Sequence, residues 1–131
     1  MGAASAIMAL SKNNNGVLAL IADSSFAKLS EIIHRKSHVL TPFIIKFMNL
    51  KNVDVTKSQP INYVDKLSMP VFFIHGDQDT LVSSEDSRCL FEKAKEPKEL
   101  WIVKGGEHGR SYFVDKKEYS KRILDFLNRY F

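Results

Sequence analysis

The fold is decided by the stretch Val71-Phe72-Phe73-Ile74-His75-Gly76-Asp77-Gln78-Asp79-Thr80-Leu81-Val82. It opens after a proline with four β-branched and aromatic residues, which is the pattern of a parallel strand buried on both faces. A glycine and two aspartates follow. Because functional side chains of parallel sheets lie on loops at the carboxyl ends of strands, this stretch predicts a buried strand that leads into a functional loop.

Two further apolar runs, 17–22 and 100–103, are predicted strands, and we expect 17–22 to be central and buried on both faces. Segments with helical spacing of apolar residues separate the strands. The predicted helices cover about 2–12, 26–50 with a break at Thr41-Pro42, 60–67, 83–94 and 116–130. This order predicts an α/β fold with three parallel strands, right-handed crossovers and flanking helices.

The composition is that of a globular domain, with 131 residues, 44% hydrophobic and 26% charged. Basic and acidic residues are interleaved, so the net charge of +4 indicates a solvated basic surface and no nucleic-acid site. The N-terminal segment is too short and alanine-rich for a membrane span and lacks a basic leader. The single cysteine, Cys89, fits a reducing compartment, so we expect a cytoplasmic location. We place Cys89 on the buried face of its helix.

A second motif, Gly105-Gly106-Glu107-His108-Gly109, follows the third predicted strand. His108 should therefore meet the aspartates of the first motif at one edge of the sheet. A histidine can take a proton from a nucleophile, and a carboxylate can hold that histidine in the required tautomer and stabilise its cation. The two loops thus carry the acid and the base of a hydrolytic triad, with Asp77 and Asp79 as candidates for the acid.

Together with Ile123-Leu124-Asp125-Phe126-Leu127, these motifs resemble the C-terminal half of the α/β-hydrolase fold, and most closely its serine aminopeptidase (S33-like) and acyl-hydrolase group. The resemblance makes 1–131 the C-terminal part of such a domain. It implies that Asp79 is the triad acid, since the family places two residues between its glycine and the acid, and that His108 is the base. Asp77 is then a turn former. It also implies that 26–59 holds cap helices that line an acyl or peptide pocket.

The resemblance reaches the N-terminus. There Met1-Gly2-Ala3-Ala4-Ser5-Ala6 looks like the end of a Gly-x-Ser-x-Gly nucleophile elbow, cut directly after its serine. Gly2 matches the second elbow glycine. Met1 matches the residue whose backbone amide donates to the oxyanion, but a terminal nitrogen is an amine, which compromises that role. The expectation is a triad whose nucleophile is missing from this sequence.

Other reactive side chains have plainer interpretations. Ser5 falls inside a helix, and Ser24 and Ser25 lack framing glycines, so none is expected to replace the nucleophile; nor is Cys89, since a thiolate is disfavoured on a buried face. His75, at a strand end, is expected to be a positioned structural residue. His34 and His38 are spaced for one helical face but have no carboxylate or cysteine nearby, so we expect neither a metal nor another cofactor.

Three functional hypotheses remain open. The first is the C-terminal fragment of a serine hydrolase that cleaves esters, thioesters or amides by acyl transfer and is inactive alone. The second is a non-catalytic α/β-hydrolase-like binding module or half of a split enzyme, and the third is an unrelated small α/β binding domain. The expected partners are a small acyl or peptide substrate of the intact parent and, through the apolar strand edge from Val17 to Ala22, a second chain.

Overall fold

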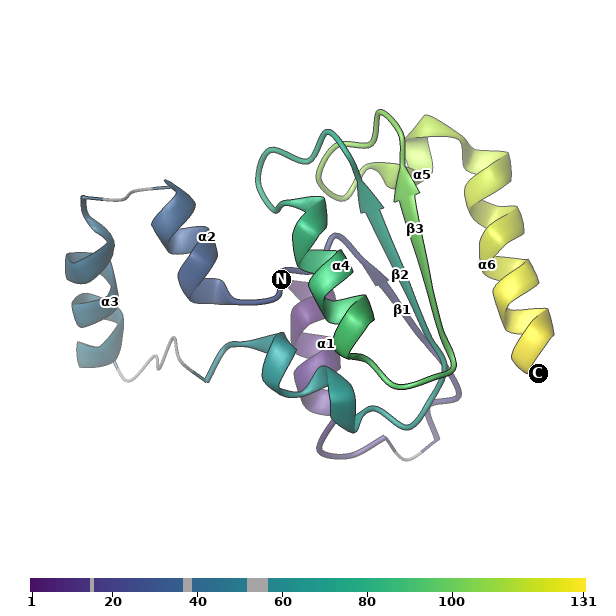
Figure 1. The fold of residues 1–131 in the computed structure, drawn as a ribbon, viewed down its shortest axis with the longest axis horizontal. Helices are drawn as coiled ribbons and strands as arrows, with labels where there is room; N and C mark the ends of the chain where they lie inside the picture. Colours follow the sequence, from purple (N-terminus) through teal and green to yellow (C-terminus); the bar gives the residue numbers. More distant parts are fainter. Residues whose placement is uncertain (15, 37–38, 52–56) are drawn as a thin grey trace.

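The computed structural model describes residues 1–14, 16–36, 39–51 and 57–131. They form one sheet of three parallel strands in the order β1-β2-β3 (Figure 1), comprising β1 (Leu20–Asp23), β2 (Val71–Gly76) and β3 (Lys98–Val103). The helical elements are α1 (Gly2–Leu10), α2 (Leu29–Lys36), α3 (Thr41–Leu50), η1 (Pro60–Asn62), η2 (Val64–Lys66), α4 (Ser84–Lys93), α5 (Ser111–Val114) and α6 (Lys116–Tyr130). This is the partial α/β-hydrolase arrangement that the sequence predicts.

The helices cover both faces of the sheet. In Figure 1, α1 and α4 lie on one face and α6 lies on the other. Successive residues of β2 serve these two layers in turn, as the pleat of a strand requires. Phe73 packs in a cluster with Ile7 of α1 and Leu90 of α4, whereas Ile74 packs with Phe126 of α6. The stretch that decides the fold therefore supplies residues to the hydrophobic clusters on both faces of the sheet.

The central strand is β2, and not the predicted 17–22 segment. All of β2 is buried, whereas β1 alternates buried and half-buried residues at the edge of the described sheet. β1 also begins later than predicted, since Val17 is exposed and lies outside it. The reason is register: Leu20 pairs with Val71, and the Leu20 amide donates to the Pro70 carbonyl oxygen at 3.0 Å. Residues before Leu20 lie beyond the start of β2 and have no strand beside them to pair with in the described sheet.

The helices agree with the prediction apart from local differences. The expected pair within 26–50 is confirmed as α2 and α3, and α6 has its predicted bounds. The segment after Pro60 forms two short 3₁₀ turns in place of one helix. The short helix α5 is an addition that the apolar pattern does not predict.

Cys89 is exposed, which corrects its expected place on the buried face of α4. The buried residues of that helix are Asp86, Ser87 and Leu90. Two of these are polar, so the inward face of α4 is rotated away from the face that hydrophobicity alone would select. Although the residue is exposed, partial burial of its thiol and the carboxylates of nearby glutamates raise the pKa of Cys89. A raised pKa makes the thiol a poor nucleophile.

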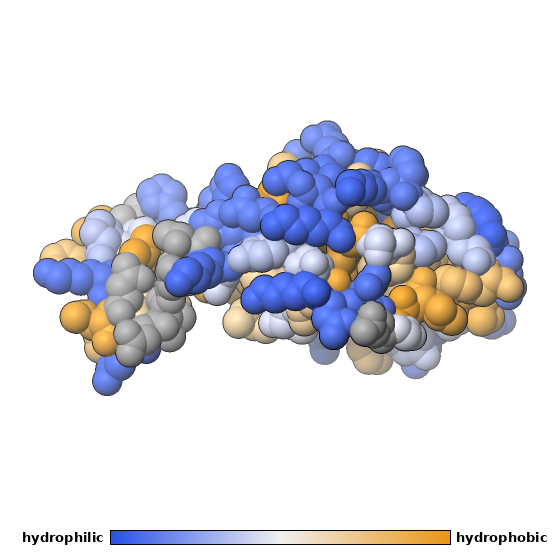
Figure 2. All heavy atoms as spheres, turned by 90° about the horizontal axis from the view of Figure 1, so that it is seen from below, coloured by the Kyte–Doolittle hydropathy of each residue, from blue (hydrophilic) through white to orange (hydrophobic). Residues whose placement is uncertain are grey.

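The predicted cap segment, 26–59, lies largely outside the sheet layers, although 37–38 and 52–56 fall outside the described residues. Figures 1 and 2 show α2 and α3 as a lobe beside the body, with hydrophobic side chains on its surface. Phe43 and Phe47 of α3 are among its exposed residues. An ion pair of 2.6 Å between Arg35 Nη2 and the buried Asp86 Oδ2 connects α2 to α4. None of the described helices is both long and apolar enough to cross a membrane.

Candidate active site

Asp79 lies on the loop after β2, and its carboxylate is fully buried. Its Oδ1 accepts hydrogen bonds from the amides of Leu81 at 2.9 Å and Val82 at 2.8 Å. Aspartate forms such turns readily because its short side chain reaches the backbone amides that follow it. These two bonds fix one oxygen, so the other oxygen, Oδ2, is directed to a single place.

His108 lies at that place, on the loop after β3. Its Nδ1 is 2.7 Å from Asp79 Oδ2, and about a third of its side chain is exposed to solvent. Because a carboxylate can only accept, Nδ1 carries the proton of this bond. Nε2 makes no hydrogen bond with any residue that the structure describes, so it can accept a proton from a group outside that set. The structure thus brings together the acid and the base proposed from the sequence.

Two glycines let the loop after β2, which carries Asp79, approach the loop after β3, which carries His108. A Cβ built on Gly76 would lie 2.0 Å from the Gly106 carbonyl oxygen, and one on Gly106 would lie 2.8 Å from the Gly76 α-carbon. The contact is closed by a hydrogen bond of 2.9 Å from the Gln78 amide to the Gly106 carbonyl oxygen. Any side chain at either glycine would push the loops apart, and with them Asp79 and His108.

Asp77, the competing acid, has a different role in the structure. Its Oδ1 accepts a hydrogen bond of 2.7 Å from the Gly105 amide, and its own amide donates to the Val103 carbonyl oxygen at 3.0 Å. The first contact joins the loop after β2 to the loop after β3, and the second joins it to the last residue of β3. Its contacts therefore hold the turn that carries His108 and do not include the His108 ring.

His75 contacts the same carboxylate from inside the protein, as its burial at the end of β2 allows. Its Nε2 lies 3.2 Å from Asp79 Oδ2 and 3.0 Å from the Val82 carbonyl oxygen, and its Nδ1 lies 2.7 Å from Ser87 Oγ. His75 and Ser87 are both fully buried. The sequence identified His75 as positioned, but it gave no signal for Ser87, which is one serine in a polar stretch of α4.

A second carboxylate, Asp23 at the end of β1, anchors the segment after His108. Its Oδ1 accepts from the hydroxyls of Ser24 at 2.9 Å and Ser111 at 3.3 Å, and its Oδ2 accepts from Tyr119 at 3.0 Å. Burial and the Asp23 carboxylate raise the pKa of Tyr119 well above its ordinary value. Ser24 Oγ also accepts from the Gly109 amide at 3.1 Å. The sequence did not predict this network, which joins β1, the segment after His108 and α6.

Neither serine after β1 is directed at the base. Ser24 has a left-handed backbone, with φ of 54°, and its hydroxyl is engaged by Asp23 and Gly109. The buried hydroxyl of Ser25 donates to the Phe26 carbonyl oxygen at 3.2 Å. Ser5 is exposed within α1. The hydroxyls of Ser24 and Ser25 are thus bonded to groups other than His108.

The start of α1 lies at the same edge of the sheet as the acid. Ala4, in the first turn of α1, is buried in a cluster with Phe26 and Val82, and the Val82 amide binds Asp79. Met1 is exposed, and its carbonyl oxygen accepts from the Ser5 amide at 3.0 Å. A Cβ on Gly2 would meet no atom of the described residues within 4 Å. The contacts present here therefore do not require a glycine at that position.

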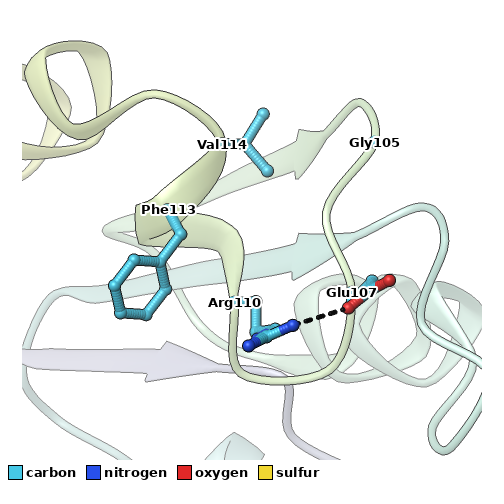
Figure 3. A pocket seen from close by; sticks show the side chains of 5 residues that line it. All are labelled: Gly105, Glu107, Arg110, Phe113 and Val114. Atoms are coloured by element: carbon cyan, nitrogen blue, oxygen red, sulfur yellow. Dashed lines mark hydrogen bonds and ion pairs between the residues drawn. The ribbon is translucent and has the colours of Figure 1, made fainter.

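The loop that carries His108 also forms a pocket of about 370 Å³ with α5 (Figure 3). Phe113 and Val114 of α5 give it an apolar wall, and an ion pair of 3.3 Å between Arg110 Nη1 and Glu107 Oε2 lies beside them. No cluster of three or more histidine, cysteine or acidic side chains that could hold a metal is found in the described parts of the chain. His38, one of the histidine pair considered from the sequence, lies outside them.

The chain is similar in sequence to several known proteins. The BD-FAE family model matches residues 6–94. The chain is 30% identical over 138 aligned residues to YqkD of Bacillus subtilis (strain 168), covering 98% of this chain and 45% of that protein. It is 38% identical over 71 residues to the polyketide transferase grgF of a Penicillium species, covering 53% of this chain and 24% of that protein.

Among solved structures, the Pyrococcus furiosus esterase PF2001 superposes with a TM-score of 0.73 at 28% identity, covering 99% of this chain and 50% of the esterase. The chain therefore spans about half the length of that structure, and also of YqkD. The family model, the parallel sheet and the esterase superposition agree with one another. The chain belongs to the BD-FAE family of the α/β-hydrolase superfamily.

Proposed function

We propose that this chain supplies the acid, Asp79, and the base, His108, of a serine-dependent acyl hydrolase. The observation that carries the proposal is the 2.7 Å hydrogen bond between Asp79 Oδ2 and His108 Nδ1. The carboxylate in this pair is buried and held by two backbone amides, while the histidine is partly open to solvent. A base needs this combination, since it must be fixed on one side and reachable on the other.

The chemistry follows from the two ring nitrogens. Nε2 of His108 takes the proton of a serine hydroxyl as the oxygen attacks the acyl carbon, and the Asp79 carboxylate stabilises the cation that forms. The protonated ring then gives the proton to the leaving alcohol or amine, which leaves an acyl-enzyme. Water, deprotonated by the same nitrogen, attacks the acyl-enzyme and releases the acid and the serine.

The nucleophile of this proposal is a serine outside the 131 residues, placed directly before Met1. The packing of Ala4 against Val82 supports this placement, because it puts the first turn of α1 beside the loop that carries Asp79. A strand-to-helix turn at that point would bring its serine to the edge of the sheet where His108 lies. Met1 would then contribute an oxyanion amide and Gly2 the second elbow glycine.

Carboxylic esters are the substrate class to test first. The similarity to the esterase extends along nearly the whole chain at 28% identity. This similarity favours an ester substrate over a thioester or an amide. Thioesters react by the same route. Peptide amides are the second class, because the motifs resemble the serine aminopeptidase (S33-like) group. The lobe of α2 and α3 is proposed to act as the cap, with part of its apolar surface facing the acyl group.

The test is a matched pair of isosteric substitutions in a chain that also carries the serine elbow and the preceding strands. Asp79→Asn should lower kcat for p-nitrophenyl esters by about 10³-fold or more, because an amide there favours the wrong histidine tautomer. His108→Ala should lower kcat by a similar factor. Asp77→Asn keeps its acceptor oxygen for the Gly105 amide, so it should change kcat by less than about tenfold.

A larger loss for Asp77→Asn than for Asp79→Asn in folded proteins would overturn the acid assignment. The 131-residue chain alone should not hydrolyse the ester, because the base has no serine to activate. Turnover by that chain that disappears with His108→Ala would refute an external nucleophile and favour one within it.

A further inference from the structure

We propose that His75 is a positioning residue for the Asp79–His108 pair, held in one tautomer by Ser87 and by the Val82 carbonyl group. The inference rests on the proposed function, because it concerns how the acid of that site is oriented. It assigns a role to two fully buried polar side chains that the acyl-transfer steps do not themselves require.

The tautomer follows from the partners of the two ring nitrogens. Nε2 of His75 faces the Val82 carbonyl oxygen at 3.0 Å and Asp79 Oδ2 at 3.2 Å. A carbonyl oxygen only accepts, so Nε2 carries the proton and donates it to Val82, and Asp79 Oδ2 is a longer contact of the same N–H group. In the neutral ring Nδ1 is then an acceptor, and the Ser87 hydroxyl at 2.7 Å donates to it. Ser87 therefore selects the form of His75 whose N–H lies beside Val82 and Asp79.

The result is a carboxylate with both oxygens held. Two backbone amides bind Asp79 Oδ1, the His108 N–H binds Oδ2, and Nε2 of His75 lies 3.2 Å from Oδ2. His75 also binds the carbonyl group of Val82, the residue whose amide binds Oδ1. These contacts come from the end of β2, whereas His108 lies on a loop. When His108 moves or exchanges its proton, the His75 N–H stays beside Oδ2 and holds Val82, whose amide binds Oδ1, so the carboxylate does not have to be reoriented in each catalytic cycle.

A purely structural role for His75 would be met by any side chain that fills the same space. Leucine would do so, but it would leave the Val82 carbonyl group without its donor, Oδ2 without the nearby N–H, and the buried Ser87 hydroxyl without its acceptor. Glutamine can place an amide N–H close to the position of Nε2. The comparison of His75→Leu with His75→Gln therefore separates volume from hydrogen bonding.

The experiment is nuclear magnetic resonance on the 131-residue chain labelled with ¹⁵N at histidine, so that it does not depend on activity. In the unsubstituted protein the ring nitrogens of His75 should show a proton on Nε2 and none on Nδ1. The low-field proton on Nδ1 of His108 should be visible. In His75→Leu that proton should exchange with water about tenfold faster, as expected for the loss of one supporting hydrogen bond. In His75→Gln the exchange rate should return most of the way to its original value.

Leu90→Ala is the matched control, since Leu90 is a fully buried neighbour on α4 and has no polar group. It should lower stability while leaving the His108 proton unchanged. A proton on Nδ1 of His75 overturns the proposal even if His75→Leu does not fold. Unchanged exchange in a folded His75→Leu protein, or failure of glutamine to restore it, also overturns the proposal. A confirmed tautomer without hydrolysis by the serine-bearing chain would instead count against the proposed function.

Discussion

Gly76 and Gly106 face each other so closely that a Cβ on Gly76 would lie 2.0 Å from the Gly106 carbonyl oxygen. One glycine ends β2 and the other lies between β3 and His108. The loops that carry Asp79 and His108 therefore meet at a backbone contact that leaves no room for a side chain at either glycine.

Gly76→Ala should destabilise the protein by at least about 2 kcal/mol, because the clash is with backbone that cannot rotate away. Gly2→Ala is the control, since a Cβ there meets nothing within 4 Å, and it should change stability by less than about 0.5 kcal/mol. Urea denaturation followed by circular dichroism measures both. Equal effects of the two substitutions would contradict the close approach of the loops.

Asp86→Ala should cost about 2 kcal/mol, because it removes the acceptor of the buried Ala27 amide and the partner of Arg35. Glu85 precedes it in the first turn of α4, but its side chain is 69% exposed. Glu85→Ala should therefore change the free energy of unfolding by less than about 0.5 kcal/mol. A comparable loss for both substitutions would show that the charge at the start of α4 matters, and not the buried contacts of Asp86.

Tyr119 should make stability sensitive to alkaline pH. Burial and the Asp23 carboxylate raise its pKa in the folded protein, so the unfolded chain ionises first. The stabilising contribution is complete below about pH 10, the ordinary pKa of tyrosine, and is lost as the pH rises toward the folded value. Since lysines and other tyrosines also titrate in this range, the informative quantity is the difference from Tyr119→Phe.

Unfolding free energies of both proteins, measured at steps from about pH 8 to about pH 11, should converge as the pH rises. At the lower end Tyr119→Phe should be less stable by about 1 kcal/mol, because the hydrogen bond to Asp23 Oδ2 is absent. A constant difference across the range would mean that Tyr119 has the same pKa in the folded and unfolded chain.

The outer edge of β1 should exchange quickly and promote association. The amides of Leu20 and Ser24 donate to the carbonyl oxygens of Pro70, just before β2, and Ile74 within it. By the alternation of a strand, the amides of Ile21 and Asp23 therefore point to the open side. Hydrogen exchange in the 131-residue chain should be faster at these two positions than at Phe73 of the central strand. Light scattering should show association that grows with concentration, since an unpaired edge can pair with another chain. A monomer at all concentrations, with Ile21 and Asp23 protected as strongly as Phe73, would contradict the open edge.

Much of this architecture is determined by local sequence. The stretch from Val71 to Ile74 is apolar without interruption, which suits a strand covered on both faces, and it belongs to the central strand of the described sheet. The helix Lys116–Tyr130 has an apolar stripe of helical period, and its Asp115 cap accepts from the Glu118 amide at 3.0 Å. The order of the two glycine motifs along parallel strands was enough to predict that His108 lies near the aspartates of the loop after Gly76, and the family resemblance singled out Asp79 from Asp77.

Tertiary structure decided what depends on register and on contacts between distant segments. Val17 is apolar enough for a strand, but β2 begins only after Pro70, so no neighbour extends the sheet to Val17. The inward face of α4 is set by hydrogen bonds of Asp86 and Ser87 with Ala27 and His75, which no hydrophobic pattern records. The spacing of apolar residues along one segment predicts which of its faces is buried, but it does not identify the residues that this face contacts. Which polar groups satisfy one another in that core depends on where the other segments lie, and this is fixed only when the whole chain has packed.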